Sequence, residues 1–277
     1  MIELFQAVRD NAFLQNALLA GIISAICCGV IGTYVVSKKI TFISGGISHT
    51  VLGGVGIICY LNKIMEINIP IIYGSIVAAL LSALIIGYVT LKKEQDADTI
   101  ISALWAFGMA IGVIFLSLTP GYNTDLMGYL FGDIIMVSRT DLYITTTLSV
   151  LVVATGLFLY RKLTAVCFDE EFSKVRGINV TLYYIMLLCL TAITVVILIQ
   201  TVGLILVIAL LSMPAGIAKK ESNSLKSTML RATIYGVIFT STGVLISYLA
   251  DLPSGATIIM IASITYVGKM AYKKSSK

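Results

Sequence analysis

Long apolar runs constrain this chain more than any other feature. Nine segments of about 17 to 25 mostly apolar residues follow one another, each long enough to cross a membrane as one α-helix. They cover residues 13–37, 42–61, 69–91, 99–119, 142–160, 181–200, 202–218, 229–249 and 253–272. The sixth and seventh runs together are too long for one span, so the chain is expected to reverse near Gln200 to Gly203.

The overall composition agrees with a membrane protein. Of the 277 residues, 58% are hydrophobic and only 12% are charged, whereas charged residues make up about 25% of a typical soluble domain. The first residues, MIELFQAVRDN, lack the basic segment and small-residue cleavage site of a signal peptide. Residues 1–277 are therefore expected to form a single all-α transmembrane domain.

Basic residues predict the orientation of the spans. All but three of the 19 Lys and Arg residues fall in alternate connections, and the exceptions are Arg9, Lys63 and Arg139. Since Lys and Arg collect on the cytoplasmic side, the N-terminus is predicted outside and the C-terminus inside. The net charge of +5 then reflects topology and gives no support to nucleic-acid binding.

The only histidine, His49, lies in a glycine-rich apolar run, KKITFISGGISHTVLGGVG. On a helix, Gly45, His49, Gly53 and Gly56 share one face, with Gly46 adjacent, so another backbone is expected to approach closely. A polar residue within a span suggests a function, and the predicted role is that of a transient metal ligand with room for a hydrated ion beside the glycines. The alternative is a packing bond from the imidazole to a carbonyl of a neighbouring helix.

Two connections stand out. Residues 120–141 have an apolar middle that is too short to cross, so this segment is expected to lie at or dip into the outer surface. Its Asp125, together with Asp251 in the last outer turn, is a candidate for attracting cations at the outer mouth.

The inner loop 161–179 contains Asp169, Glu170, Glu171 and Phe172 ahead of Gly177, an order that predicts a short helix ended by the glycine. Such a helix suits docking to a soluble partner, while a solvated loop is the alternative. Pro214, near the inner end of the seventh span, is expected to break or kink that helix.

Several catalytic signatures are absent from the sequence. It contains no phosphate-binding loop, no pair of carboxylates within the spans and, with one histidine, no H-E-x-x-H motif. The five cysteines form no C-x-x-C pair and are interpreted as small apolar residues. The chain is therefore not expected to be an enzyme, and the energy for any transport should come from elsewhere.

Five segments, in order, resemble the permease subunits of ATP-binding-cassette importers for zinc and manganese, the ZnuB and MntB group. They are GTYVVSKKITFISGGISHTVLGGVG, TDLMGYLFGDI, FDEEFSKVRGI, VGLILVIALLSMPAGIAKK and DLPSGATII. The resemblance implies a prokaryotic plasma-membrane permease of the type II fold. It also implies a second permease copy, separate ATPase subunits and an extracytoplasmic binding protein, with no tightly bound cofactor.

The resemblance also bears on the transported metal. Many family members carry an acidic residue four positions before the histidine, where this chain has Gly45. Because imidazole suits zinc and carboxylates suit manganese, zinc is slightly favoured. Two other functions remain open, a permease for a metal chelate and a structural or signalling membrane subunit with no conducting path.

Overall fold

A computed structural model describes residues 11–92, 97–120 and 137–275 of the chain. These residues are almost entirely helical. The helices are α2 (Ala12–Lys38), α3 (Thr41–Met65), α4 (Ile71–Leu91), α5 (Ala97–Leu118), α7 (Arg139–Phe158), α8 (Tyr160–Phe168), α9 (Glu170–Val175), α10 (Val180–Val202), α11 (Leu204–Glu221), α12 (Leu225–Ala250) and α13 (Ser254–Ser275).

The predicted all-α membrane fold is confirmed. Eight of these helices are long and apolar enough to cross a membrane, and α11 occupies the position of the remaining predicted span. Because α11 ends in Lys219, Lys220 and Glu221, its apolar part is shorter than that of the other long helices. The predicted segment 120–141 lies largely outside the described residues, apart from Pro120 and the residues that lead into α7.

Short polar side chains define where several helices begin. The hydroxyl of Ser138 accepts a hydrogen bond from the backbone N–H of Asp141, whose carboxylate accepts one from the Ser138 N–H, which forms a capping box at the start of α7. Asn11 and Asn179 cap α2 and α10 more simply, because their side-chain oxygens accept hydrogen bonds from backbone N–H groups of the first turn. The spans are therefore delimited by local sequence as well as by apolar length.

The chain reverses between α10 and α11 at the predicted place. Gly203 separates them with a φ of 80°, a left-handed conformation that suits glycine because it has no Cβ. Pro214 does not end α11, since this helix continues to Glu221. Of the two predicted effects, a break or a kink, the break was wrong, because the surrounding packing maintains the helix through a buried proline.

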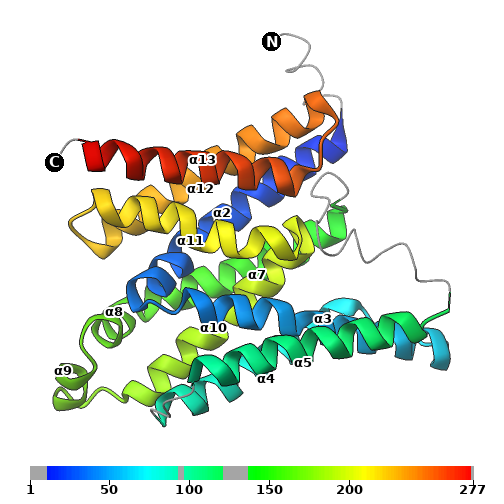
Figure 1. Cartoon of the computed structure of the whole chain (residues 1–277), viewed down its shortest axis with the longest axis horizontal. Helices are drawn as coiled ribbons and strands as arrows, with labels where there is room; N and C mark the ends of the chain where they lie inside the picture. The colour runs from blue at the N-terminus through cyan, green and yellow to red at the C-terminus, as the bar shows by residue number, and fades with distance from the viewer. Residues whose placement is uncertain (1–10, 93–96, 121–136, 276–277) are drawn as a thin grey trace.

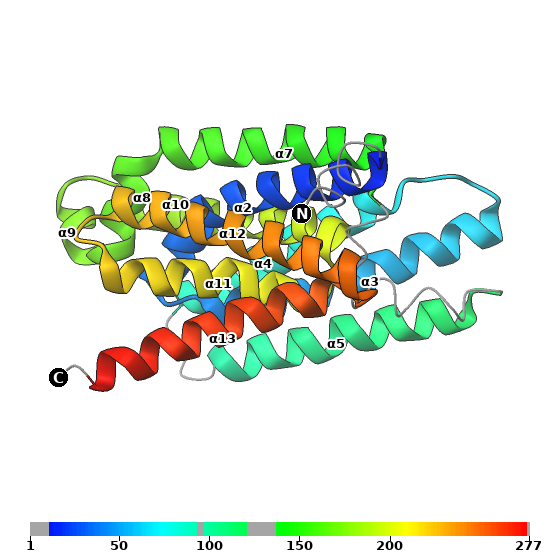
Figure 2. The same cartoon turned by 90° about the horizontal axis from the view of Figure 1, so that it is seen from above.

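The helices form two groups joined by α10 (Figure 1). One group contains α2, α11, α12 and α13, and the other contains α3, α4 and α5, with α10 packing against α2, α4 and α7. Seen from above, α7 lies along one edge of the bundle, whereas α5 and α13 lie along the opposite edge (Figure 2). The bundle therefore has two distinct lateral faces.

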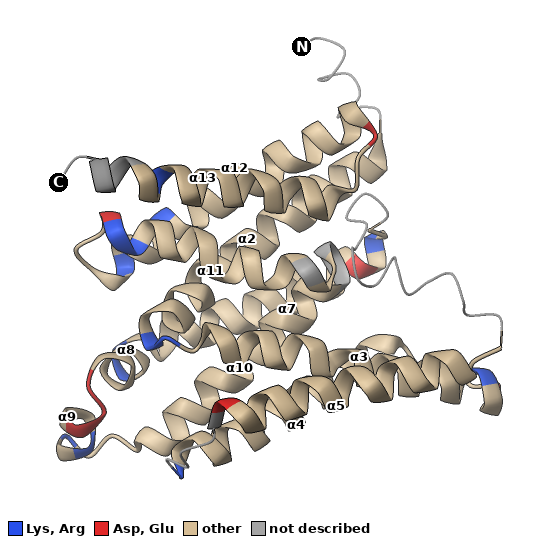
Figure 3. Ribbon diagram, in the orientation of Figure 1, with Lys and Arg blue, Asp and Glu red and all other residues tan. Residues whose placement is uncertain are grey.

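Charged residues are segregated to the ends of the bundle. Figure 3 shows Lys and Arg gathered at the end that carries α8, α9 and the turn between α11 and α12, with few at the other end. This distribution places α8, α9 and the C-terminus inside, as the sequence predicted.

Candidate functional site

His49 packs face to face with the only tryptophan of the chain. The ring centroids of His49, on α3, and Trp105, on α5, lie 4.2 Å apart, and the ring planes differ by 12°. Trp105 is fixed in turn by Phe42, whose ring centroid is 6.2 Å away, and by a hydrogen bond from its Nε1 to the sulfur of Met109, at 3.2 Å. The aromatic contacts therefore orient the imidazole.

Stacking on Trp105 leaves the edge of the His49 ring, which carries both nitrogens, outside that contact. The stacked Trp105 ring covers one face of the imidazole, whereas the nitrogen lone pair and N–H lie in the ring plane. Nδ1 of His49 is buried and has no hydrogen-bond partner among the described residues. A packing bond from this nitrogen to a neighbouring carbonyl, the alternative drawn from the sequence, is therefore not found there.

The glycines near His49 are packing residues. A Cβ on Gly53 would lie 2.9 Å from the carbonyl oxygen of Gly108, and one on Gly56 would lie 2.6 Å from that of Gly112, both on α5. The expected close approach of another backbone is thus found within one chain. The further expectation, that these glycines give a hydrated ion room, stays a prediction.

The other predicted packing residues contact different helices. A Cβ on Gly45 would lie 3.3 Å from Cδ1 of Ile208 on α11, and one on Gly46 would lie 2.9 Å from Cγ2 of Ile101 on α5. Pro214 is buried within α11. The helix that carries His49 therefore contacts α11 in addition to α4 and α5.

Of the two carboxylates predicted for the outer mouth, only Asp251 belongs to the described part of the chain. Asp125 lies outside the described residues. Asp251 is exposed and ends α12 in a left-handed conformation, with a φ of 53°. No group of three or more His, Cys, Asp or Glu side chains within the described ranges could hold a metal ion, so His49 needs ligands from elsewhere.

The predicted short inner helix is α9. The Asp169 carboxylate accepts a hydrogen bond from the backbone N–H of Phe172, at 2.9 Å, which caps the helix, and Glu170 and Glu171 occupy its first turn. Gly177 follows with a φ of 74°, so the chain turns there as the sequence indicated. Lys38, at the end of α2, forms an ion pair with Glu170.

Apolar side chains are exposed around α9 at the inner end. Phe168, Phe172 and Val175 are 64%, 50% and 87% exposed, and the guanidinium of Arg176 lies 4.8 Å from the centre of the Phe172 ring. Exposed apolar groups beside charged ones are typical of a protein-binding surface.

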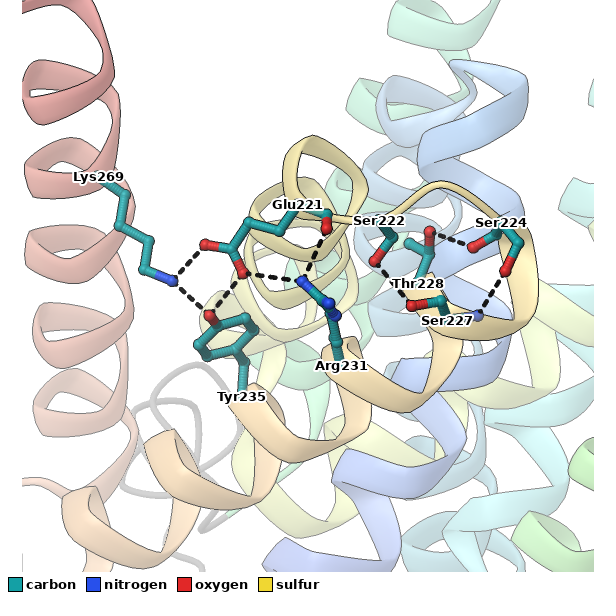
Figure 4. A network of polar contacts seen from close by, with 8 residues as sticks. All are labelled: Glu221, Ser222, Ser224, Ser227, Thr228, Arg231, Tyr235 and Lys269. Carbon is teal, nitrogen blue, oxygen red and sulfur yellow. Dashed lines mark hydrogen bonds and ion pairs between the residues drawn. The ribbon is translucent and has the colours of Figure 1, made fainter. Parts of the chain in front are cut away.

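A polar cluster joins three helices at the same end (Figure 4). The Glu221 carboxylate, at the end of α11, accepts hydrogen bonds from Nζ of Lys269 on α13, at 2.6 Å, and from the hydroxyl of Tyr235 on α12, at 2.8 Å. Arg231 donates to the backbone carbonyl of Glu221, at 2.7 Å. Because α13 is the last helix, this cluster stabilises the packing of its inner end against α11 and α12.

Sequence reasoning missed Trp105 and the pair Gly108 and Gly112. Trp105 is the only tryptophan and lies within a predicted span, and G-M-A-I-G is a small-residue spacing that favours close helix packing. Both signals were present in the sequence, but neither identifies the helix that is contacted.

Residues 10–273, nearly the whole chain, match the ABC 3 transport family. The chain belongs to this family. A probable metal transport system membrane protein of Chlamydia muridarum is 37% identical over 95% of this chain and 89% of its own length. The manganese transport system membrane protein MntC of Halalkalibacterium halodurans is 33% identical over 94% of this chain and 87% of its own.

A solved structure agrees with this assignment. PsaBC from Streptococcus pneumoniae, in complex with Fab, superposes with a TM-score of 0.85 and 30% sequence identity, covering 96% of this chain and 94% of that one. The ABC 3 family member described here is thus a multi-pass protein of a bacterial inner membrane, with a transport role.

Proposed function

We propose that this chain is the membrane-spanning permease of an ATP-driven importer, which moves a divalent transition-metal cation inward past His49. The observation that carries the proposal is the stacked imidazole, whose buried Nδ1 lacks a hydrogen-bond partner in the described part of the chain. An oriented neutral imidazole is a good ligand for transition metals.

The ligand shell has to be completed from outside the described residues. A second permease copy would supply a second His49, and water or backbone carbonyls would fill the remaining positions. An incomplete shell suits transport, because a pathway site must bind an ion well enough to admit it and weakly enough to release it. Asp125 and Asp251 are proposed to concentrate cations at the outer mouth.

Energy and delivery are assigned to partner proteins. We place an ATPase against α9, where Asp169, Glu170, Glu171 and Gly177 shape the helix and Phe172 offers an apolar contact. An extracytoplasmic metal-binding protein would deliver the ion from outside. The family of this chain and the name of the MntC relative support this arrangement.

Manganese and zinc are both candidates for the ion. The sequence slightly favoured zinc because of its single imidazole and absent carboxylate, whereas the manganese transport relatives favour manganese. Uptake of radioactive manganese into vesicles that contain the complete transporter, with unlabelled zinc or unlabelled manganese as competitor, discriminates between them. The ion that competes at the lower concentration is the better substrate.

The test of the site compares His49→Phe with His49→Ala. Phenylalanine retains a ring to stack on Trp105 but removes both nitrogens, so the proposal predicts at least a tenfold loss of uptake with normal assembly. If His49 only packs, His49→Phe should transport normally and His49→Ala should lose assembly in proportion to uptake. Normal uptake in both variants would remove His49 from the mechanism.

A further inference from the structure

A cavity of about 730 Å³ lies near the inner end of the bundle, away from His49. Its walls come from the α7–α8 junction and from the first turns of α12, and Val30 of α2 also lines it. Figure 2 shows α7 on the opposite edge of the bundle from α5, which carries Trp105. The cavity is thus distinct from the proposed metal pathway.

The cavity has a basic rim. Arg161 and Lys162, in the first turn of α8, and Lys226, in the first turn of α12, all line it, and no acidic residue does. None of the three forms an ion pair within the described residues. Instead, Nζ of Lys226 lies 5.3 Å from the centre of the Tyr160 ring, and Nζ of Lys162 lies 5.2 Å from that of Tyr183.

The walls become apolar with depth on both sides. On α12, Lys226 is followed by Met229 and Leu230, and Thr233 lies about 10 Å farther along the helix axis than Lys226. On the other side, Leu157 and Phe158 form the last turn of α7, just before the basic residues of α8.

Several of these apolar side chains face outward. Phe158 and Leu230 are 88% and 65% exposed on a lateral face of the bundle, where lipid chains would contact them. The cavity therefore opens toward the hydrocarbon region while its charged rim stays at the inner surface.

We propose that this cavity binds an anionic phospholipid of the inner leaflet, with its phosphate at Arg161 and Lys226 and its acyl chains along Leu157 and Leu230. Basic groups that form no ion pair at the cytoplasmic ends of spans attract anionic headgroups. The apolar wall of the cavity would contact the acyl chains of the same lipid. The cavity volume of about 730 Å³ is large enough for a lipid headgroup and the upper part of the acyl chains. A bound lipid would join α7, α8 and α12 at one point.

The experiment titrates the purified chain, in neutral detergent, with phosphatidylglycerol and with phosphatidylcholine of the same acyl chains, followed by native mass spectrometry. Phosphatidylglycerol should bind at least tenfold more tightly. The double variant Arg161→Gln with Lys226→Gln should weaken that binding about 25-fold, or about fivefold for each charge removed. Arg161→Lys should retain it, because the charge is kept.

A matched control variant removes two other inner basic residues, with Lys92→Gln and Lys174→Gln, and should change the affinity less than twofold. Equal affinity for the two lipids, or equal losses in the two double variants, would overturn the proposal. A third titration uses inorganic phosphate, monitored by calorimetry. Phosphate binding as tight as that of phosphatidylglycerol would also overturn it, because the site would then take a soluble anion.

Discussion

The ammonium group of Lys38, in the last turn of α2, lies 2.5 Å from a carboxylate oxygen of Glu170, in the first turn of α9. It also donates a hydrogen bond to the carbonyl of Val166, on α8, at 3.0 Å. The Lys38 side chain is only 14% exposed, so this contact is partly shielded from water. The proposed ATPase-docking helix is thereby tied directly to a central span.

This contact distinguishes two neighbouring acids. Glu170→Gln should lower the metal transported per ATP hydrolysed several-fold, because α9 loses its ionic link to α2, worth about 1 kcal/mol for a partly exposed pair. Glu171→Gln removes the same charge from the same turn but breaks no ion pair in the described structure, so it is the matched control. Equal behaviour of the two variants in reconstituted vesicles would contradict the link.

Trp105 should act by orienting His49. Trp105→Leu removes a ring contact worth about 0.5–1.5 kcal/mol, so the metal concentration for half-maximal uptake should rise several-fold while assembly is unchanged. Phe107→Leu, an exposed aromatic on the same helix, serves as the control. Uptake that is equally affected in both variants would indicate a general effect on α5.

The packing of α3 on α5 should be sensitive to one methyl group. A Cβ on Gly112 would lie 2.6 Å from the carbonyl oxygen of Leu52, so Gly112→Ala should destabilise the protein by about 1–3 kcal/mol through overpacking. A Cβ on Gly268, in α13, would meet no atom within 4 Å, so Gly268→Ala should be neutral or stabilising. Thermal unfolding in detergent compares the two, and similar melting temperatures would refute the close contact.

The sequence predicted the spans well because membrane length and apolar character are local properties. Gly203 and Gly177 were likewise identified at turns, since a left-handed backbone favours glycine wherever it occurs. The partners of the helices could not be predicted in this way. Gly53 and Gly56 indicated a close neighbour, but only the structure identified it as α5, because that pairing depends on residues distant in sequence.

The same limit applies to the candidate site. His49 was singled out as a lone polar residue in a span, yet its stacking on Trp105 depends on the packing of α3 against α5. The glycine face of α3 packs on α5, as the close approach predicted, whereas the room that it would give an ion stays a prediction. A pattern of glycines predicts close approach but cannot distinguish a neighbouring helix from an open path.

The Glu221 cluster should show a defined pH dependence. The hydrogen bond from Lys269, helped by the one from Tyr235, holds the pKa of the Glu221 carboxyl below its ordinary value of about 4.5. The apolar part of α11 ends before Lys219, so this carboxyl lies beyond the spanning segment. Because the folded-state pKa is lowered, its stabilising contribution is present above the ordinary pKa and disappears as pH falls through the folded value.

Glu221→Gln should therefore lower the melting temperature of the detergent-solubilised protein at pH 7, and the difference from the unmodified protein should shrink below about pH 4.5. The effect should be about 1 kcal/mol or less, because the side chain is 32% exposed and solvent screens the pair. Amide exchange should also increase at the inner end of α13, since Lys269 loses its ionic partner. Glu171→Gln should show neither change, and a melting difference that stays constant down to pH 3.5 would rule out an ionic origin for the contribution of Glu221.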